Sequence, residues 1–123
     1  MSTRCNIIIK NKWDKFFIYR HCDGYPQVAG KDLIKRFKDK INQDYIWITD
    51  FVNELVKDKN NDYEITDSVH GDIKYLYTID MDKKTFEVQE VDAQWKDDEV
   101  YQTFHKKQDL LPLVQKLEGE TQC

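Results

Sequence analysis

The 123-residue chain is 40% apolar and 13% aromatic, and its formal net charge is −4. This length fits one compact domain (1–123), whose aromatic side chains can build a core without a metal or disulfide. The acidity argues against direct nucleic-acid binding, because phosphate contacts favour a strongly basic surface. No run of about 20 apolar residues predicts a membrane span, and residues 1–12 lack signal-peptide features, so we expect a cytoplasmic protein.

The cysteine spacing and the absence of known catalytic motifs argue against an enzyme. Cys5, Cys22 and Cys123 form no CxxC pair, so we expect reduced thiols and no zinc site. The chain has no P-loop, GxGxxG, HExxH, GxSxG or EF-hand sequence. We therefore expect no catalytic residues, no metal and no cofactor.

Charge is distributed unevenly along the chain. Residues 1–40 hold ten basic and four acidic residues, residues 41–79 hold three and eight, and residues 80–123 hold six and eleven. This polarity predicts a basic and an acidic pole, with ordinary solvated faces as the alternative. Five of the basic residues belong to the first predicted helix, and we expect them to form its solvent-exposed face: Lys31, Lys35, Arg36, Lys38 and Lys40.

The N-terminal segment predicts a β-hairpin. β-branched and aromatic residues fill 5–10 and 15–22, and the polar residues 11–14 suit the turn between them. Both faces of the second strand carry apolar bulk, so we expect it to be covered on both sides near its start. Alternation places its side chains on two faces: Phe16, Ile18, Arg20 and Cys22 on one, and Phe17, Tyr19, His21 and Asp23 on the other.

Two helices follow a turn at 23–26 that contains Gly24 and Pro26. The first begins after Gly30, and the second has Asn42 or Asp44 available as its N-cap. Apolar residues at helical spacing define the two buried stripes: Leu33, Ile34, Phe37 and Ile41 in the first helix, and Ile48, Phe51, Val52, Leu55 and Val56 in the second.

The next segment predicts strands. Residues 57–62 suit a polar loop, and 63–66 suit a short strand. Alternating residues at 73–80 and 85–91, joined through 81–84, give the clearest hairpin of the chain.

The C-terminal segment contains one ambiguous region and one clear helix. Residues 95–107 suit either a short helix through Val100, Tyr101 and Phe104 or a loop. The final helix is capped by Asp109, is ended by Gly119 and has one apolar stripe: Leu110, Leu111, Leu113, Val114 and Leu117. The expected fold is therefore α+β, an antiparallel sheet with helices packed on it in the order ββααβββα.

The hairpin end offers a candidate anion site. Arg4 precedes the first strand and Arg20 ends the second, so antiparallel pairing brings both guanidinium groups to one end of the sheet. With His21 and Tyr25 they would bind a nucleotide or another phosphorylated or carboxylate ligand. Asp23 or a C-terminal acidic residue is an equally suitable internal partner for these cations.

His21 and Asp23 form the one acid–base candidate in the sequence. They lie two residues apart and therefore on one strand face, where an imidazole and a carboxylate could orient a base. A metal would need a third ligand. The alternative is a pair of polar residues that satisfy a turn.

Acidic residues gather in the segment 80–99. Eight carboxylates lie there beside Trp95 and Tyr101: Asp80, Asp82, Glu87, Glu90, Asp92, Asp97, Asp98 and Glu99. Carboxylates with aromatic anchors among them can imitate a phosphate backbone and bind a basic channel. We expect this surface to bind a partner protein, with plain solvation as the alternative.

Two short motifs resemble small hypothetical proteins of bacteriophages and archaeal viruses. The chain begins Ser2-Thr3-Arg4-x-Asn6-Ile7, and its second strand ends in Tyr19-x-His21-x-Asp23-Gly24-Tyr25-Pro26, with Cys22 where an aromatic is often found. The resemblance covers about the first thirty residues and implies a phage or prophage origin. Small acidic phage proteins of this kind are often inhibitors of host machinery, including anti-CRISPR proteins.

Three functions follow in order of expectation. The first is a non-enzymatic inhibitor that binds a host nucleic-acid-handling protein, such as a CRISPR effector, through the acidic segment. The second is a sponge for a nucleotide at the Arg4, Arg20 and His21 corner. The third is a hydrolase that uses His21 and Asp23. Separately, an exposed sheet edge would allow the protein to form a homodimer.

Overall fold

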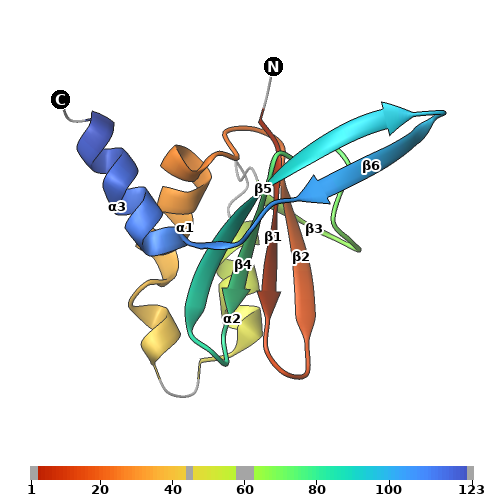
Figure 1. The fold of residues 1–123 in the computed structure, drawn as a ribbon. Coiled ribbons are helices and arrows are strands. Elements are labelled where there is room, and N and C mark those ends of the chain that lie inside the picture. Colours follow the sequence, from red (N-terminus) through yellow and green to blue (C-terminus); the bar gives the residue numbers. More distant parts are fainter. Residues whose placement is uncertain (1–2, 44–45, 58–62, 122–123) are drawn as a thin grey trace.

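The computed structural model describes residues 3–43, 46–57 and 63–121 (Figure 1). The predicted cap Asp44, most of the predicted loop 57–62 and Cys123 lie outside the described residues. The α+β class and the general order ββααβββα are confirmed, with two further strands, β6 and β7, between β5 and the last helix. The elements are β1 (Cys5–Lys10), β2 (Lys15–Arg20), the π-helical turn η1 (Pro26–Gly30), α1 (Lys31–Phe37), the 3-10 turn η2 (Lys40–Asn42), α2 (Ile48–Val56), β3 (Tyr63–Thr66), β4 (Tyr75–Asp80), β5 (Thr85–Lys96), β6 (Glu99–Phe104), β7 (Gln108–Asp109) and α3 (Leu110–Thr121).

The sheet has the strand order β3-β2-β1-β4-β5-β6, and β7 pairs with the first half of β5. The predicted hairpin is present, with Cys5 opposite Arg20. One central pair, β1 and β4, is parallel, and the other pairs are antiparallel. The parallel pair arises because the chain leaves β3 at one edge and returns through residues 67–74 to enter β4 beside β1.

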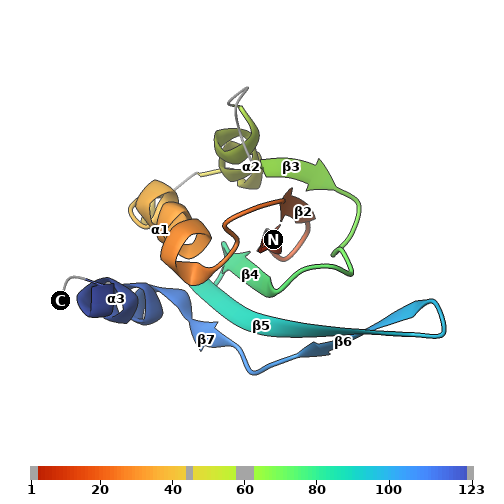
Figure 2. The same cartoon turned by 90° about the horizontal axis from the view of Figure 1, so that it is seen from above.

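Helices cover one face of the sheet (Figure 2). The inward side chains of β1, β2 and β4 meet the apolar stripes of α1, α2 and α3 in one buried cluster. At its centre the rings of Phe37 and Phe51 stack with centroids 4.2 Å apart. Gly30 lies where α1 approaches α3, because a Cβ there would come within 2.9 Å of a Leu110 methyl carbon. Close approach of these helices therefore depends on a residue without a side chain.

A smaller cluster lies on the opposite face of the sheet. Tyr19, Leu76 and Val91 are buried there beneath the segment that joins β3 to β4, from which Ile73 contributes. This second cluster is the reason why β2 carries apolar residues on both faces. The two-sided cover is at the end of β2, since Lys15 is exposed while Ile18 and Tyr19 are buried, so the expectation of cover near its start is wrong.

The region 95–107 is mostly neither helix nor loop. β5 extends to Lys96, and β6 returns from Glu99 to Phe104 as its antiparallel partner. The helix through Val100 is a wrong prediction, because Val100 and Phe104 belong to a strand whose side chains alternate between two faces. The acidic run at 97–99 supplies a hairpin turn and not a helix start.

Two predicted helix ends also differ from the structure. α2 begins after Trp47, whose backbone N–H donates to the Asp50 carboxylate at 3.0 Å, while Asn42 belongs to η2. α3 continues through Gly119 to Thr121, so this glycine does not end the helix.

Among the described residues, no helix is long and apolar enough to span a membrane.

Candidate interaction surface

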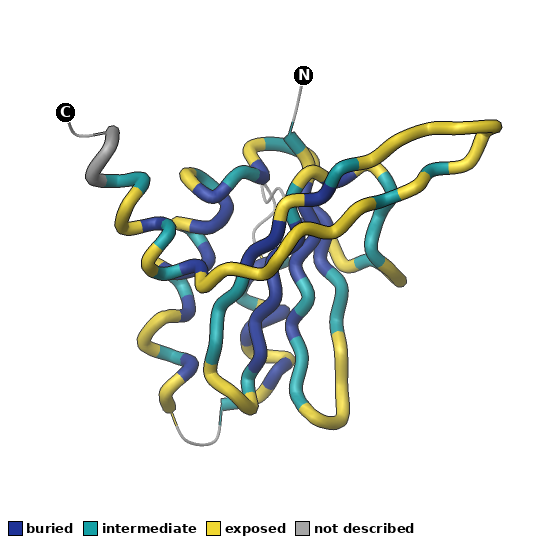
Figure 3. Tube along the Cα trace, viewed as in Figure 1, coloured by how far each residue is buried: buried dark blue, intermediate teal, exposed yellow. Residues whose placement is uncertain are grey.

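The second half of β5 and β6 form a hairpin that projects from the sheet, here called the arm (Figure 1). β5 pairs with β4 over its first six residues and with β6 over its last six. Most residues of the arm beyond its base are exposed (Figure 3). The arm therefore contributes little to the core, and most of its side chains are open to the surroundings.

Two aspartates form the turn of the arm. Asp97 and Asp98 lie between the paired residues Lys96 and Glu99, and both have positive φ angles, 53° and 65°. Consecutive positive φ values are typical of the two-residue hairpin turn that favours Asn-Gly. Aspartate tolerates this conformation less well than glycine does, so the acidic turn is a poor choice for hairpin stability alone.

Exposed aromatic side chains stand beside these carboxylates. Trp95 is 70% exposed and Tyr101 is 53% exposed. Trp95 lies opposite Val100, whereas Tyr101 lies opposite Gln94, so the two rings occupy opposite faces of the arm. The Tyr101 hydroxyl donates to the Glu99 carboxylate at 2.9 Å. Together these residues form a negatively charged tip with an aromatic ring on each face.

The base of the arm is fixed by ionic and polar contacts. Asp92 accepts from Lys74 Nζ at 3.0 Å and contacts His105 Nε2 at 2.6 Å. The hydrogen bond to His105, with the contact to Lys74, holds the pKa of Asp92 below its usual value. The same carboxylate raises the pKa of Lys74. Asp92 is thus paired with Lys74 and hydrogen-bonded to His105, and is not an open negative charge.

The segment between β3 and β4 also supports the arm. Gln102 Nε2 donates to the His70 carbonyl at 2.9 Å. A Cβ at Gly71 would lie 2.9 Å from a Val100 methyl carbon, so the backbone of this segment contacts β6 directly. This segment therefore supports the arm as far as Val100, and the turn residues Asp97 and Asp98 lie beyond these contacts.

The predicted acidic surface is divided by the fold. Glu87 and Glu90 lie three residues apart on β5 and so on opposite faces of the sheet. Asp80 is buried and accepts from the backbone N–H groups of Asp82 and Lys83, which makes it part of the β4–β5 turn. Of the acidic and aromatic residues that the sequence suggested as a partner-binding surface, five gather at the arm tip: Trp95, Asp97, Asp98, Glu99 and Tyr101.

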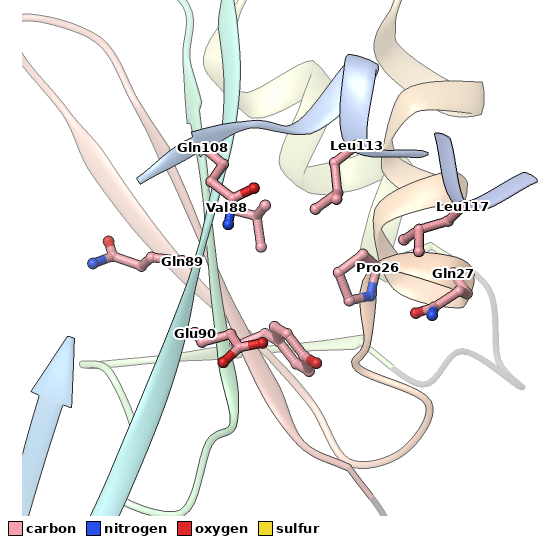
Figure 4. Close-up of a pocket in the computed structure, with 9 residues that line it drawn as sticks. Pro26, Gln27, Val88, Gln89, Glu90, Gln108, Leu113 and Leu117 are labelled. Carbon is pink, nitrogen blue, oxygen red and sulfur yellow. The ribbon is translucent and has the colours of Figure 1, made fainter. Parts of the chain in front are cut away.

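Glu90 lines a separate cleft between η1, β5 and α3 (Figure 4). Pro26, Val88 and Leu113 supply apolar walls, and the cleft has a volume of about 230 Å³. Burial raises the pKa of the Tyr75 phenol in this cleft, and the Glu90 carboxylate adds to the effect. Its volume is below the roughly 300–1,000 Å³ typical of small-molecule pockets.

The candidate anion corner is also divided. The Arg20 side chain lies over the Tyr63 ring on the helix-covered face, at 4.8 Å from its centroid, and donates from Nε to the Cys22 carbonyl. His21 lies on the other face, with its ring against Tyr19 and Nε2 3.1 Å from Glu64. Alternation along β2 therefore prevents Arg20 and His21 from sharing one pocket.

The remaining members of the corner contact carboxylates of the chain itself. Arg4 Nε lies 3.4 Å from Asp72, which also accepts from the Tyr19 hydroxyl at 3.0 Å. Asp23 accepts from the Tyr25 hydroxyl at 3.2 Å. His21 thus contacts Glu64, and Asp23 contacts Tyr25, so the structure does not bring His21 and Asp23 together as an acid–base pair.

Two tryptophans that the sequence analysis did not single out lie at the end of the sheet opposite to the arm. Trp13 and Trp47 are 77% and 72% exposed, and both line a hollow of about 450 Å³. The sequence does contain a signal: Trp13 occupies the middle of a hairpin turn, where neither sheet face is available to bury it.

No group of three potential metal ligands occurs in the part of the chain that the structure describes.

Comparison of the chain with family models, curated proteins and solved structures finds no match.

Proposed function

We propose that this chain is a non-enzymatic, phage- or prophage-encoded inhibitor that binds a host nucleic-acid-handling protein through the arm tip. The observation that carries this proposal is the arm itself, a projecting hairpin with three carboxylates at its turn and an exposed aromatic ring on each face. A CRISPR effector is the type of target expected from the resemblance of residues 2–26 to small viral proteins.

The shape and charge of the tip suit a basic channel. Asp97, Asp98 and Glu99 present three carboxylates next to the single cation Lys96. Carboxylates at such spacing can contact the arginine and lysine side chains that normally bind phosphates, and steer the encounter electrostatically. Trp95 and Tyr101 supply the aromatic anchors that dominate binding energy in many interfaces.

The strained turn supports a functional role for its charges. Asn-Gly would form the same turn with less backbone strain, so a chain selected for hairpin stability alone would not need two aspartates there. The acidic turn is consistent with selection for contact with a positively charged partner.

The first experiment separates the charge of the tip from its fold. Asp97→Asn combined with Asp98→Gly removes two charges while favouring the hairpin turn, so we expect equal or higher thermal stability and at least tenfold weaker binding to the target complex. Reversal of the three carboxylates, in the variant Asp97→Lys/Asp98→Lys/Glu99→Lys, should abolish binding. The matched control reverses two exposed carboxylates outside the arm, Asp39 and Asp67, and should bind as the wild type does.

The second experiment tests the site on the target. Because the arm would occupy a nucleic-acid channel, excess DNA or RNA ligand should displace the protein, and added salt should weaken the complex steeply. If the triple reversal binds every tested defence complex as tightly as the wild type does, the proposal is wrong.

The nucleotide sponge keeps a simple test of its own. A ligand that binds the native state raises the melting temperature by mass action. A panel of nucleotides, cyclic signalling nucleotides included, should produce no shift if the carboxylate contacts of Arg4 and His21 already satisfy these side chains. A shift that is lost in Arg4→Ala would favour the sponge over the inhibitor.

A further inference from the structure

The outer edge of β6 carries backbone groups that the arm itself does not use. The His105 N–H donates to the Glu90 carbonyl at 2.9 Å, so these two residues form a hydrogen-bonded pair of the antiparallel ladder. Such pairs recur at every second residue, so the odd-numbered residues of β6 direct their backbone groups towards β5. Three residues direct their N–H and C=O groups away from β5: Val100, Gln102 and Phe104.

Within the described ranges, no strand covers this edge. β6 is the last strand in the order of the sheet, and β7 pairs with β5 only, at Glu87 and Val88 (Figure 2). The segment between β3 and β4 contacts β6 through side chains, those of Val100 and Gln102. The outward backbone groups of β6 are therefore left to water or to a strand of another molecule.

The opposite edge of the arm is less suited to such a strand. The Val91 N–H at its base already donates to the Lys74 carbonyl at 2.7 Å. Along the exposed part of β5, only Ala93 and Trp95 direct their backbone groups to this side. β6 thus offers the longer open edge of the two.

The edge of β6 is complementary to itself. If two copies pair antiparallel with Gln102 opposite its own counterpart, Val100 of each copy lies opposite Phe104 of the other, and the outward groups of both strands are satisfied. Val100 and Phe104 lie on the same face of the arm as Trp95 and Val91, with which they pair. The four strands of the two arms then carry continuous apolar rows on one face.

The same register places the acidic tip of each copy beside a basic segment of the other. Lys106 and Lys107 follow β6 directly, and both are exposed. Lys106 lies four residues after Gln102 and Asp98 lies four residues before it, so two-fold symmetry places them opposite each other. Lys107 and Asp97 correspond in the same way. The symmetry repeats each contact, so four ammonium groups meet four carboxylates.

No like charges face each other along the paired strands. Glu99 lies opposite His105 of the second copy, and Tyr101 lies opposite Thr103. Opposite charges across neighbouring strands stabilise a sheet, and like charges directly opposite destabilise it. Backbone groups, apolar side chains and charges along 97–107 therefore all match in one register.

We propose that two copies of the chain associate through the outer edges of β6, antiparallel and with Gln102 on the two-fold axis. The contact is isologous, because the same edge serves in both copies, so association stops at the dimer. This proposal does not rest on the inhibitor function. It has a consequence for that function, because Asp97 and Asp98 contact lysines in the dimer, and only the monomer presents an open tip to a target.

The decisive experiment reverses each side of the charged contact separately. The tip variant is Asp97→Lys/Asp98→Lys, and the base variant is Lys106→Glu/Lys107→Glu. Circular dichroism and thermal unfolding verify that both are folded. Sedimentation of the protein alone, over about 1 µM to 1 mM, then measures dimerisation in a range that brackets the affinity of a small interface, without any target present.

Each sample has its own expected result. Wild-type protein should change from monomer to dimer as concentration rises, and should form nothing larger. Each variant alone should dimerise at least tenfold more weakly, because like charges meet at both ends of the contact. An equimolar mixture of the two variants should form a heterodimer about as readily as the wild type dimerises, because every tip then meets a base of opposite charge.

A cysteine placed on the two-fold axis tests the register independently. Residues in a hydrogen-bonded antiparallel pair have Cα atoms about 5.5 Å apart, a separation that a disulfide spans. Mild oxidation should therefore convert Gln102→Cys to a covalent dimer. Gln94→Cys is the matched control, since Gln94 is exposed on β5 and two strands would separate it from its counterpart. This control should crosslink no more than the wild type does.

Three results would overturn the proposal. A wild-type protein that stays monomeric over the whole range lacks the contact. A mixture of the two charge variants that dimerises no better than either alone would show that tip and base do not meet. Equal crosslinking of Gln102→Cys and Gln94→Cys would exclude the register about Gln102, and would assign any dimer to another edge of the sheet.

Discussion

The two halves of β5 have the same backbone geometry and different surroundings. The first half, Thr85–Glu90, lies between β4 and β7 and contributes Val88 to the core beneath the helices. The second half, Val91–Lys96, pairs with β6 alone and is mainly exposed after its first residue. One continuous strand therefore joins a scaffold that holds its position to an arm that presents side chains to other molecules.

This comparison separates stability from recognition. Side chains in the sheet body contact α1, α2 and α3, so their replacement should unfold the protein. Side chains at the arm tip contact few other groups, so their replacement should change binding and leave the fold intact. Four predictions test this separation, beginning with the largest expected effect.

Phe37→Ala should destabilise the scaffold most. The ring is fully buried and stacks on Phe51, so its loss should lower the free energy of unfolding by about 3–5 kcal/mol. Chemical denaturation measures this change. Trp95→Ala on the arm is the matched control and should lower stability by less than about 0.5 kcal/mol, because its side chain is exposed. Equal losses for the two variants would contradict the division between scaffold and arm.

Alkaline pH should destabilise the scaffold through Cys5. Burial raises the pKa of its thiol to about 12 from 9.0. A folded-state pKa above the unfolded value gives stability that is complete below pH 9 and is lost as pH rises towards 12. The slope for this group is up to about 1.4 kcal/mol per pH unit.

The control for this pH dependence is a variant without the titrating group. Cys5→Ala should be less stable at neutral pH, because a small cavity forms, but its stability should fall less steeply between pH 9 and 11. Denaturation at a series of pH values provides the measurement. Parallel curves for the two proteins would show that Cys5 does not titrate in this way.

Gly71→Ala should disturb the junction between scaffold and arm. The added Cβ would lie 2.9 Å from a Val100 methyl carbon, so we expect a loss of about 1–3 kcal/mol from overpacking. Val100→Ala in the same chain should recover part of the loss, because it removes the methyl groups that collide. A double-mutant cycle measures this coupling, and additive effects would mean that the two residues do not meet.

Asp92→Asn should have the smallest effect. Its contacts with Lys74 and His105 are half exposed, so we expect a small fall in melting temperature that added salt reduces further. Because the folded-state pKa of Asp92 is lowered, its stabilising effect is present above the unfolded value and is lost as pH falls through the folded value. The melting temperatures of the two proteins should therefore converge in acid.

The fold class and most elements were predictable because the apolar patterns are strong. Alternation at 73–80 and the stripe through Phe51 and Leu55 leave little choice between strand and helix. The partner change of β5 was not predictable, since a strand pattern does not say which strand lies beside it. The arm was missed because its acidic turn also resembles the first turn of a helix.

The candidate sites show the same limit. The acidic residues in 80–99 were evident from the sequence. Their separation into the buried Asp80, the paired Asp92 at the base of the arm and the exposed carboxylates at its tip depends on three-dimensional contacts. The separation of Arg20 from His21, in contrast, follows from the alternation along β2, so the sequence already argued against a pocket that contains both. Trp13 and Trp47 are far apart in the chain, so the hollow that they share could not be inferred from their spacing.

The parallel pair of β1 and β4 has a consequence for how the chain folds during synthesis. Cys5 lies opposite Tyr75, so β1 lacks one of its two neighbours until residues 75–80 have been synthesised. Contacts between residues so distant in sequence slow folding, because loop closure precedes the gain from pairing. The edge of β1 that faces β4 therefore stays unpaired while the β1–β2 hairpin is already complete.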